Sequence, residues 1–230
     1  MRTKTMKNTF LDPTVMPLQA VSSPITKVKR AITAIGLGLA LLSTTASVQA
    51  SSGNVLPPTA RPHGYSLDDM AAAVANFSIS GNDPAYYPDT PFQIIHRRPG
   101  DTFTVAPGTF LYLKFFFIDD AEPVIGNWPA DKSEVEEYIF GRDQLGGHDL
   151  EVEIDGKVTS LDDAGYVGGP VETPDSPDGS QHLLQIGAFV SPLKKGTHTI
   201  TIRGVFDGTA FVDLVGGPFA TEITYTVIVE

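Results

Sequence analysis

Acidic side chains gather in one stretch of this sequence, residues 119–137, around its only tryptophan. The stretch reads DDAEPVIGNWPADKSEVEE and follows the very apolar run TFLYLKFFFI. Hard cations such as Ca²⁺ take six to eight oxygen ligands, and an irregular acidic loop can supply several of them. We therefore take Asp119, Asp120, Glu122 and Asp131 as candidate calcium ligands. EF-hand spacing is missing, and the alternative interpretation is a solvated acidic loop.

A second candidate group lies at Gly146-Gly147-His148-Asp149. A histidine beside a carboxylate can act as a general base or a metal ligand, and two glycines allow close approach of a substrate. With Asp120, the residues His148 and Asp149 would form the catalytic cluster of a small secreted enzyme. The alternative is a glycine turn that leads into a strand. We favour it because adjacent residues of a strand point to opposite faces.

Aromatic residues on expected loops support a third hypothesis, a glycan-binding domain. Tyr86, Tyr87 and Trp128 could stack on sugar rings, although loop aromatics also close the ends of a core. The sequence has no Gly-x-Ser-x-Gly elbow, phosphate-binding loop, dinucleotide fingerprint or cysteine pair. Hydrolases with that elbow and enzymes that use a nucleotide cofactor are therefore not supported.

The first 50 residues predict a secretory signal peptide. Lys27, Lys29 and Arg30 precede the uncharged run AITAIGLGLALLSTTASVQA, and small residues at Val48 and Ala50 predict cleavage after Ala50. The apolar run is too short to hold the chain across a bilayer, so we expect no membrane anchor after cleavage. We expect an exported protein, periplasmic or extracellular. Its lack of cysteine excludes disulfides and a lipid-modified cysteine.

The charge of the processed chain limits its partners. Residues 1–50 contain six Lys or Arg and one Asp, so the other 180 residues carry a formal charge of −16. Such a surplus repels nucleic acid and anionic lipid. The partners that remain are a cation such as calcium, a glycan, or a basic component of the cell envelope.

Alternating apolar and polar residues predict most of the strands. Ile200 and Ile202 alternate with threonines, residues 223–229 do the same, and Asp155-Gly156 predicts a hairpin turn. Eight to ten strands with Gly/Pro turns predict an all-β fold, an antiparallel β-sandwich that is Ig-like or jelly-roll-like, with one or two short helices. We expect residues 66–230 to form this single domain after a flexible leader over residues 51–65.

Four expectations concern particular segments. Capping boxes predict helices that begin after Ser66, with Asp69, and after Ser133, with Glu136. Residues 210–214 are expected to form a strand, and residues 162–180 a polar loop. His198 falls on the face of Ile200, which favours a core or edge histidine over a metal ligand.

The C-terminal part resembles a group of secreted bacterial β-sandwich proteins of unsettled function. The resemblance rests on the turn and strand Pro192–Ile200 (PLKKGTHTI) and on the Thr-Tyr pair of the last strand, Thr224-Tyr225. Pro107-Gly108-Thr109 and the hairpin Ile154–Lys157 are similar to that group as well. The similarity covers roughly residues 100–230 and implies a sandwich fold. It supplies no catalytic residues, and the tryptophan-rich N-terminal stretch of many members is missing here.

Overall fold

The computed structural model describes residues 53–96, 102–173, 176 and 178–230. The described residues all belong to one compact unit. The predicted signal peptide, residues 1–50, lies outside them. In the part of the chain that the structure describes, no helix is long and apolar enough to cross a membrane.

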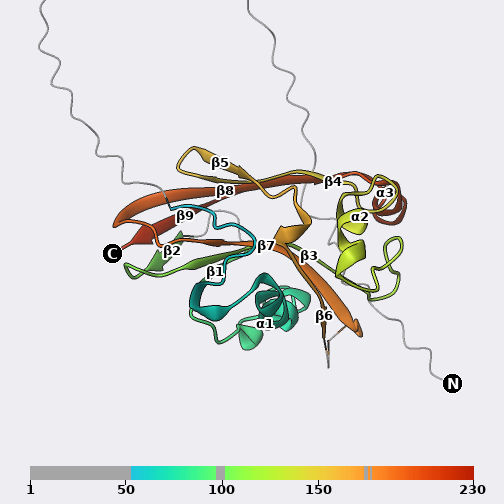
Figure 1. The fold of residues 1–230 in the computed structure, drawn as a ribbon, viewed down its shortest axis with the longest axis horizontal. Helices are drawn as coiled ribbons and strands as arrows, with labels where there is room; N and C mark the ends of the chain where they lie inside the picture. The colour runs from blue at the N-terminus through green and yellow to red at the C-terminus, as the bar shows by residue number, and fades with distance from the viewer. Residues whose placement is uncertain (1–52, 97–101, 174–175, 177) are drawn as a thin grey trace, which may run out of the picture. The chain divides into compact units, whose positions relative to one another are not determined.

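Most of the secondary structure lies in two sheets (Figure 1). The four-stranded sheet has the order β1-β3-β7-β6, with β1 at Gln93–Ile95, β3 at Leu111–Asp119, β7 at His182–Val190 and β6 at Val167–Glu172. The five-stranded sheet has the order β2-β9-β8-β4-β5, with β2 at Thr102–Val105, β9 at Phe219–Val229, β8 at Gly196–Phe206, β4 at Gly147–Ile154 and β5 at Lys157–Ser160. The expected all-β class is therefore confirmed.

Both sheets are mixed, which corrects the expectation of purely antiparallel pairing. Strand β1 runs parallel to β3, and β2 runs parallel to β9. The other strand pairs are antiparallel. The chain crosses from one sheet to the other between β1 and β2, so two consecutive segments each join a different sheet. Alternation along a strand identifies its faces but not its partner, so the sequence did not reveal these parallel edges.

One buried cluster contains residues of both sheets. The ring of Phe116 on β3 stacks on Phe206 of β8 with centroids 4.3 Å apart. The pairing of β3 with β7 shifts register between Lys114 and Phe116, which marks a β-bulge. Strand β3, which contains the aromatic run, lies between β1 and β7, and most side chains on both of its faces are buried. The absence of alternation in its sequence predicted this.

Helix α1, Leu67–Ile79, covers the other face of the four-stranded sheet (Figure 1). Ser66 and Asp69 form the predicted capping box. Helix α2, Val135–Phe140, follows a short 3₁₀ turn, Lys132–Glu134. Asp131 caps that turn by accepting from the backbone N–H of Ser133, so the cap lies two residues before the predicted one. Three more 3₁₀ turns occupy Pro62–Gly64, Pro84–Tyr86 and Ala164–Tyr166.

Two segments differ from the sequence prediction. Residues expected to form a strand at 210–214 lie in helix α3, Thr209–Val215, which ends at Gly216 in the left-handed conformation. A short apolar run fits a strand and a buried helical turn equally well, and here only Phe211 is buried. The expected loop 162–180 contains β6, whose Gly-Gly-Pro sequence concealed an edge strand.

The described part of the leader is paired with the sheet rather than loose. Val55 forms a β-bridge with Val190, and the N–H of Leu56 donates to the carbonyl of Phe189. Strand β6 pairs only with the first part of β7, so residues 54–56 occupy the edge that β6 leaves open. A chain segment beside an unpaired strand edge satisfies that strand's backbone groups.

His198 explains the PLKKGTHTI motif. It is 2% exposed, and its Nδ1 lies 2.7 Å from Asp155 Oδ2 while its Nε2 lies 2.8 Å from the carbonyl oxygen of Lys194. Asp155 also accepts from the N–H of Thr199. The ring therefore joins the turn before β8 to the hairpin between β4 and β5, and two of the motifs that carried the resemblance are in direct contact.

His198→Gln is expected to lower the free energy of unfolding by about 1 kcal/mol, because an amide can reach only one of the two acceptors and the bridge between the two turns is lost. Urea unfolding monitored by Trp128 fluorescence measures the change. An unchanged unfolding midpoint would show that this bridge does not contribute to stability.

Candidate functional site

Three connecting segments meet at one end of the two sheets. They join β3 to β4, β6 to β7, and β8 to β9. The N–H of Gly208 donates to Leu145 O, and Asp120 accepts from the backbone of His182, so hydrogen bonds tie the segments together. Gly146 has a φ of +61°, and a Cβ there would overlap the backbone of Gly208. Glycine therefore allows the first and third segments to approach this closely.

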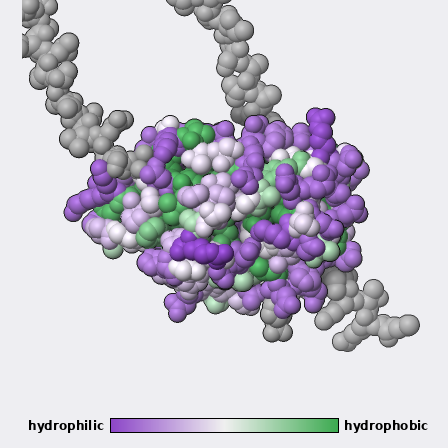
Figure 2. All heavy atoms as spheres, in the orientation of Figure 1, coloured by the Kyte–Doolittle hydropathy of each residue, from purple (hydrophilic) through white to green (hydrophobic). Residues whose placement is uncertain are grey.

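We call this region the acidic end. Its described residues in 120–146, 173–181 and 207–218 contain ten carboxylates and two cations, Lys132 and Arg142, a formal charge of −8. Among the described residues, the connections β2–β3, β4–β5 and β7–β8 at the opposite end of the strands carry Asp155, Lys194 and Lys195, a formal charge of +1, and Glu230 follows β9 there. The region around α2 and α3 is mostly hydrophilic in Figure 2. Negative charge is thus concentrated at one end of the strands.

Asp120 joins β3 to β7. Its Oδ1 accepts from the N–H groups of Gln181 and His182, at 2.6 and 2.9 Å, and its Oδ2 lies 2.8 Å from His182 Nδ1. These hydrogen bonds to the backbone and ring of His182 lower the pKa of Asp120 although its burial opposes them. This predicted calcium ligand therefore has both oxygens engaged by protein donors.

Asp119 is the buried member of the predicted set. It is 5% exposed, Oδ1 accepts from the N–H of Ala121, and Oδ2 has no hydrogen-bond partner among the described residues. Burial and, second, the charge of Asp178 raise the pKa of Asp119 to about 6. Burial disfavours the charged form of this carboxyl group, so its ionisation near neutral pH destabilises the folded protein.

The four predicted calcium ligands do not form one centre. Asp131 caps a 3₁₀ turn, and Glu122 is exposed. Among the described residues there is no group of three or more His, Asp or Glu that could hold a metal ion. The acidic composition of this segment predicted a charged surface. The spacing of the carboxylates did not predict that each one would have a different local partner.

His148 and Asp149 lie on the same side of β4, which corrects our argument from alternation. Asp149 has a φ of +52°, and the pairing of β4 with β8 shifts register after His148. This bulge brings His148 Nδ1 to 3.0 Å from Asp149 Oδ2, while Nε2 lies 3.4 Å from Asp207 Oδ2. The hydrogen bond to Asp149, followed by that to Asp207, raises the pKa of His148. Asp120 pairs with His182 instead, so the expected catalytic cluster is not assembled.

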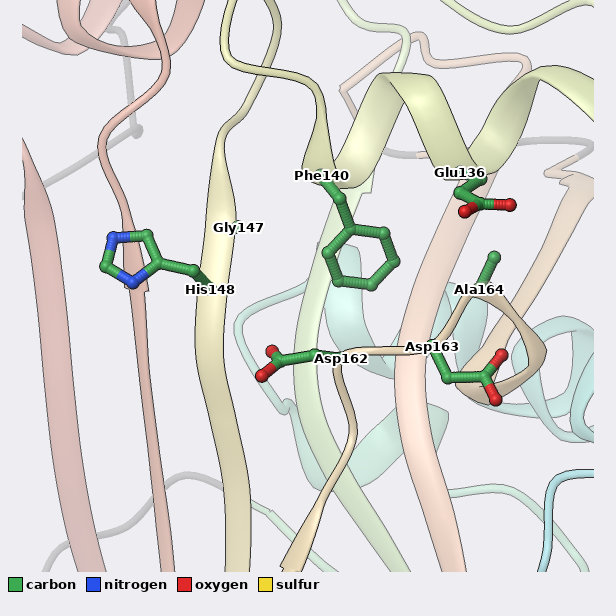
Figure 3. A pocket seen from close by; sticks show the side chains of 7 residues that line it. All are labelled: Glu136, Phe140, Gly147, His148, Asp162, Asp163 and Ala164. Carbon is green, nitrogen blue, oxygen red and sulfur yellow. The ribbon is translucent and has the colours of Figure 1, made fainter.

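A pocket of about 440 Å³ lies between α2, the beginning of β4 and residues 162–164 (Figure 3). The carboxylates of Glu136, Asp162 and Asp163 line it, together with the ring of Phe140. His148 lies at its edge, and Figure 3 shows the imidazole pointing away from the other side chains. Asp120 does not line this pocket, contrary to the enzyme hypothesis.

The three aromatic residues proposed for glycan stacking have separate surroundings. The Tyr87 ring packs edge-on against Phe77, and Trp128 packs against Tyr138 with centroids 5.5 Å apart. Tyr86 is 45% exposed. No ring contact joins Trp128 to either tyrosine among the described residues. Two of the three therefore pack on the domain itself.

Sequence reasoning missed a buried polar group under α1. Lys114 is 6% exposed, and its Nζ donates to Ser78 Oγ at 3.0 Å and lies over the rings of Phe77 and Phe117. Ser78 donates in turn to Gln185. Burial lowers the pKa of Lys114 to about 7. A single lysine inside the apolar run TFLYLKFFFI was the available signal.

Comparisons with known proteins do not assign a family. No family model and no curated protein match the chain. The crystal structure of the cysteine protease inhibitor EhICP2 from Entamoeba histolytica is similar at 14% identity over 62% of this chain and 99% of that chain, with a TM-score of 0.26. The solution structure of Amebosin is similar at 14% identity over 61% of this chain and 100% of that chain, with a TM-score of 0.25. TM-scores this low do not establish a common fold.

Proposed function

We propose that this protein is an exported binding module without a catalytic role, and that its acidic end binds a basic protein or peptide of the cell envelope or its surroundings. The observation that carries the proposal is the concentration of charge, −8 at one end of the strands against +1 at the other. Charge separated in this way orients an approaching cationic partner and raises its rate of association.

The fold supports this role. We propose a β-sandwich in which the two mixed sheets are the layers, supported by their shared core and by the stacking of Phe116 on Phe206. Connecting segments at one end of such a scaffold are free to vary in sequence and are often the binding surface. Here three of them are held together by backbone hydrogen bonds, which limits the entropy that binding must remove.

Calcium stabilisation of the module is a further part of the proposal, and Asp119 is the predicted ligand at which it can be tested. Its Oδ2 has no hydrogen-bond partner among the described residues, which leaves this oxygen available to a ligand. The alternatives of a His/carboxylate enzyme and a glycan-binding domain have less support, because Asp120 pairs with His182 and does not line the pocket at His148, and because Trp128 packs on Tyr138.

The proposal predicts binding of octalysine to the exported protein, whose first residue should be Ser51. Fluorescence polarisation at low and physiological salt measures the affinity. Neutralising three exposed residues of the acidic end, as Glu137→Gln/Asp143→Asn/Asp213→Asn, should weaken binding about tenfold, since exposed charge pairs contribute up to about 1 kcal/mol each. Added salt should weaken binding as well.

A matched triple variant, Asp83→Asn/Asp89→Asn/Glu230→Gln, removes the same charge away from the acidic end and should change the affinity less than twofold. Equal losses in the two triple variants would mean that net charge alone attracts the peptide. Absence of octalysine binding at low salt would overturn the proposed function.

A further inference from the structure

The pocket beside α2 has a lining unlike that of a metal site. Three carboxylates surround it, but the described residues hold no group of three acidic or histidine side chains close enough to bind a metal ion. In Figure 3 the carboxylates of Glu136 and Asp163 lie on either side of Ala164, and that of Asp162 lies apart from both. Negative charge is therefore distributed around the pocket rather than directed at one point.

The three carboxylates differ in how far they are already engaged. Asp162 accepts from the N–H of Leu150 at 2.8 Å and from Ser160 Oγ at 3.2 Å, and Asp163 accepts from the N–H of Gly165 at 2.7 Å. These two residues are fixed by turns. Glu136 makes no side-chain hydrogen bond or ion pair with any described residue. Its carboxylate is thus the acceptor most available to a ligand.

Phe140 adds an aromatic face to this charged lining. It lies one helical turn after Glu136, so both side chains lie on the same side of α2. Figure 3 shows the ring between Asp162 and Glu136. A guanidinium group is planar, weakly hydrated and able to donate five hydrogen bonds in different directions, and it stacks on aromatic rings. Lysine presents its charge at a single point, and a metal ion needs converging ligands.

His148 does not oppose a cation in this pocket. Among the described residues that line the pocket it is the only basic side chain. Its ring is bound to Asp149 and faces Asp207, and it points away from Phe140 in Figure 3. When His148 is protonated, these two aspartates balance its charge.

We propose that this pocket binds an arginine side chain, with the guanidinium over the Phe140 ring and hydrogen-bonded to Glu136. The inference deepens the proposed function and rests on it in one respect, that the arginine belongs to the basic partner of the acidic end. A pocket for one side chain would fix the position of a partner that long-range charge only attracts.

The test is an NMR titration of the exported protein with Nα-acetyl-arginine methylamide. The lysine analogue and the neutral isostere Nα-acetyl-citrulline methylamide serve as comparison ligands. We expect millimolar binding of the arginine probe, weaker binding of the lysine probe, no binding of citrulline, and shifts centred on Phe140, Gly147 and Ala164. Glu136→Gln should weaken arginine binding about threefold to fivefold. Glu137→Gln, the same change one residue further along α2 and outside the pocket, removes the same charge and should weaken arginine binding less than Glu136→Gln does.

The possible results test the arginine pocket and the proposed function separately. Equal shifts with arginine and citrulline, or equal losses for Glu136→Gln and Glu137→Gln, would overturn the arginine pocket. Phe140→Leu binding arginine as well as the native protein would do the same. Octalysine binding with no arginine binding would leave the proposed function standing without the pocket. Arginine binding without octalysine binding would retain the pocket and overturn the wider role of the acidic end.

Discussion

Replacing Lys114 with methionine is expected to stabilise the protein by about 3 kcal/mol at pH 6. Burial lowers the pKa of Lys114 from 10.5 to about 7. Between these values the unfolded chain binds more protons than the native protein, so stability rises with pH, and below pH 7 the whole cost of the buried charge is present. That cost has an upper limit of about 5 kcal/mol, and the hydrogen bond to Ser78 offsets part of it.

Methionine fits this test because it keeps the length of the lysine stem, and Ser78 still has Gln185 as a partner. Thermal and urea unfolding at pH 6 and pH 10 give the comparison. The gain should be largest at pH 6 and shrink towards pH 10, where the native lysine is neutral. Lys195→Met, at an exposed site, should change stability by less than about 0.5 kcal/mol at either pH. Equal destabilisation of Lys114→Met at both pH values would mean that the amine is not desolvated.

Although Lys114 lowers stability, its amine makes a specific contact between α1 and the four-stranded sheet. Replacing a buried charge by an apolar side chain of similar size is often stabilising, so lysine at this position lowers the stability of the domain. The amine lies against Ser78 in the last turn of α1, where the negative end of the helix dipole favours a cation. Lys114 therefore links α1 to the four-stranded sheet through a specific contact rather than through packing alone.

Local patterns predicted the elements of this fold better than their partners. The capping box at Ser66 and the hairpin at Asp155-Gly156 depend on a few neighbouring residues, and both are present. The parallel pairing of β2 with β9 joins residues more than a hundred positions apart. No periodicity within β2 specifies it, because the partner is chosen by the packing of the whole domain.

In the candidate site as well, local features could be predicted from the sequence and long-range partners could not. The acidic character of residues 119–137 was visible, but the partner of Asp120 is His182, sixty-two residues further along the chain. Alternation predicted that His148 and Asp149 point to opposite faces of the strand. In the structure a bulge, marked by a positive φ at Asp149, places them on the same side. Bulges change the direction of individual side chains, and the sequence around Asp149 contains no pattern that predicts one.

Asp119→Asn is expected to raise the free energy of unfolding by about 2 kcal/mol at pH 7 and above. The native pKa of Asp119 is raised from 3.8 to about 6, mainly by burial. The native protein therefore binds this proton more tightly than the unfolded chain does. Stability falls as pH rises from about 4 to 6 and stays reduced above that range. Asparagine keeps an acceptor for the N–H of Ala121 and removes the charge.

Urea unfolding from pH 4 to pH 8 should show this fall in the native protein and a flatter profile in the Asp119→Asn variant. Asp131→Asn, which keeps the cap of an exposed turn, should leave the fall in place. Parallel profiles for native protein and Asp119→Asn would show that Asp119 is not desolvated. Melts with Ca²⁺ and with EDTA extend the test, because a cation that binds only the native state raises its midpoint. If the free Oδ2 of Asp119 binds calcium, Ca²⁺ should raise the melting temperature of the native protein and not that of Asp119→Asn. Without such a difference, Asp119 is not part of a calcium site.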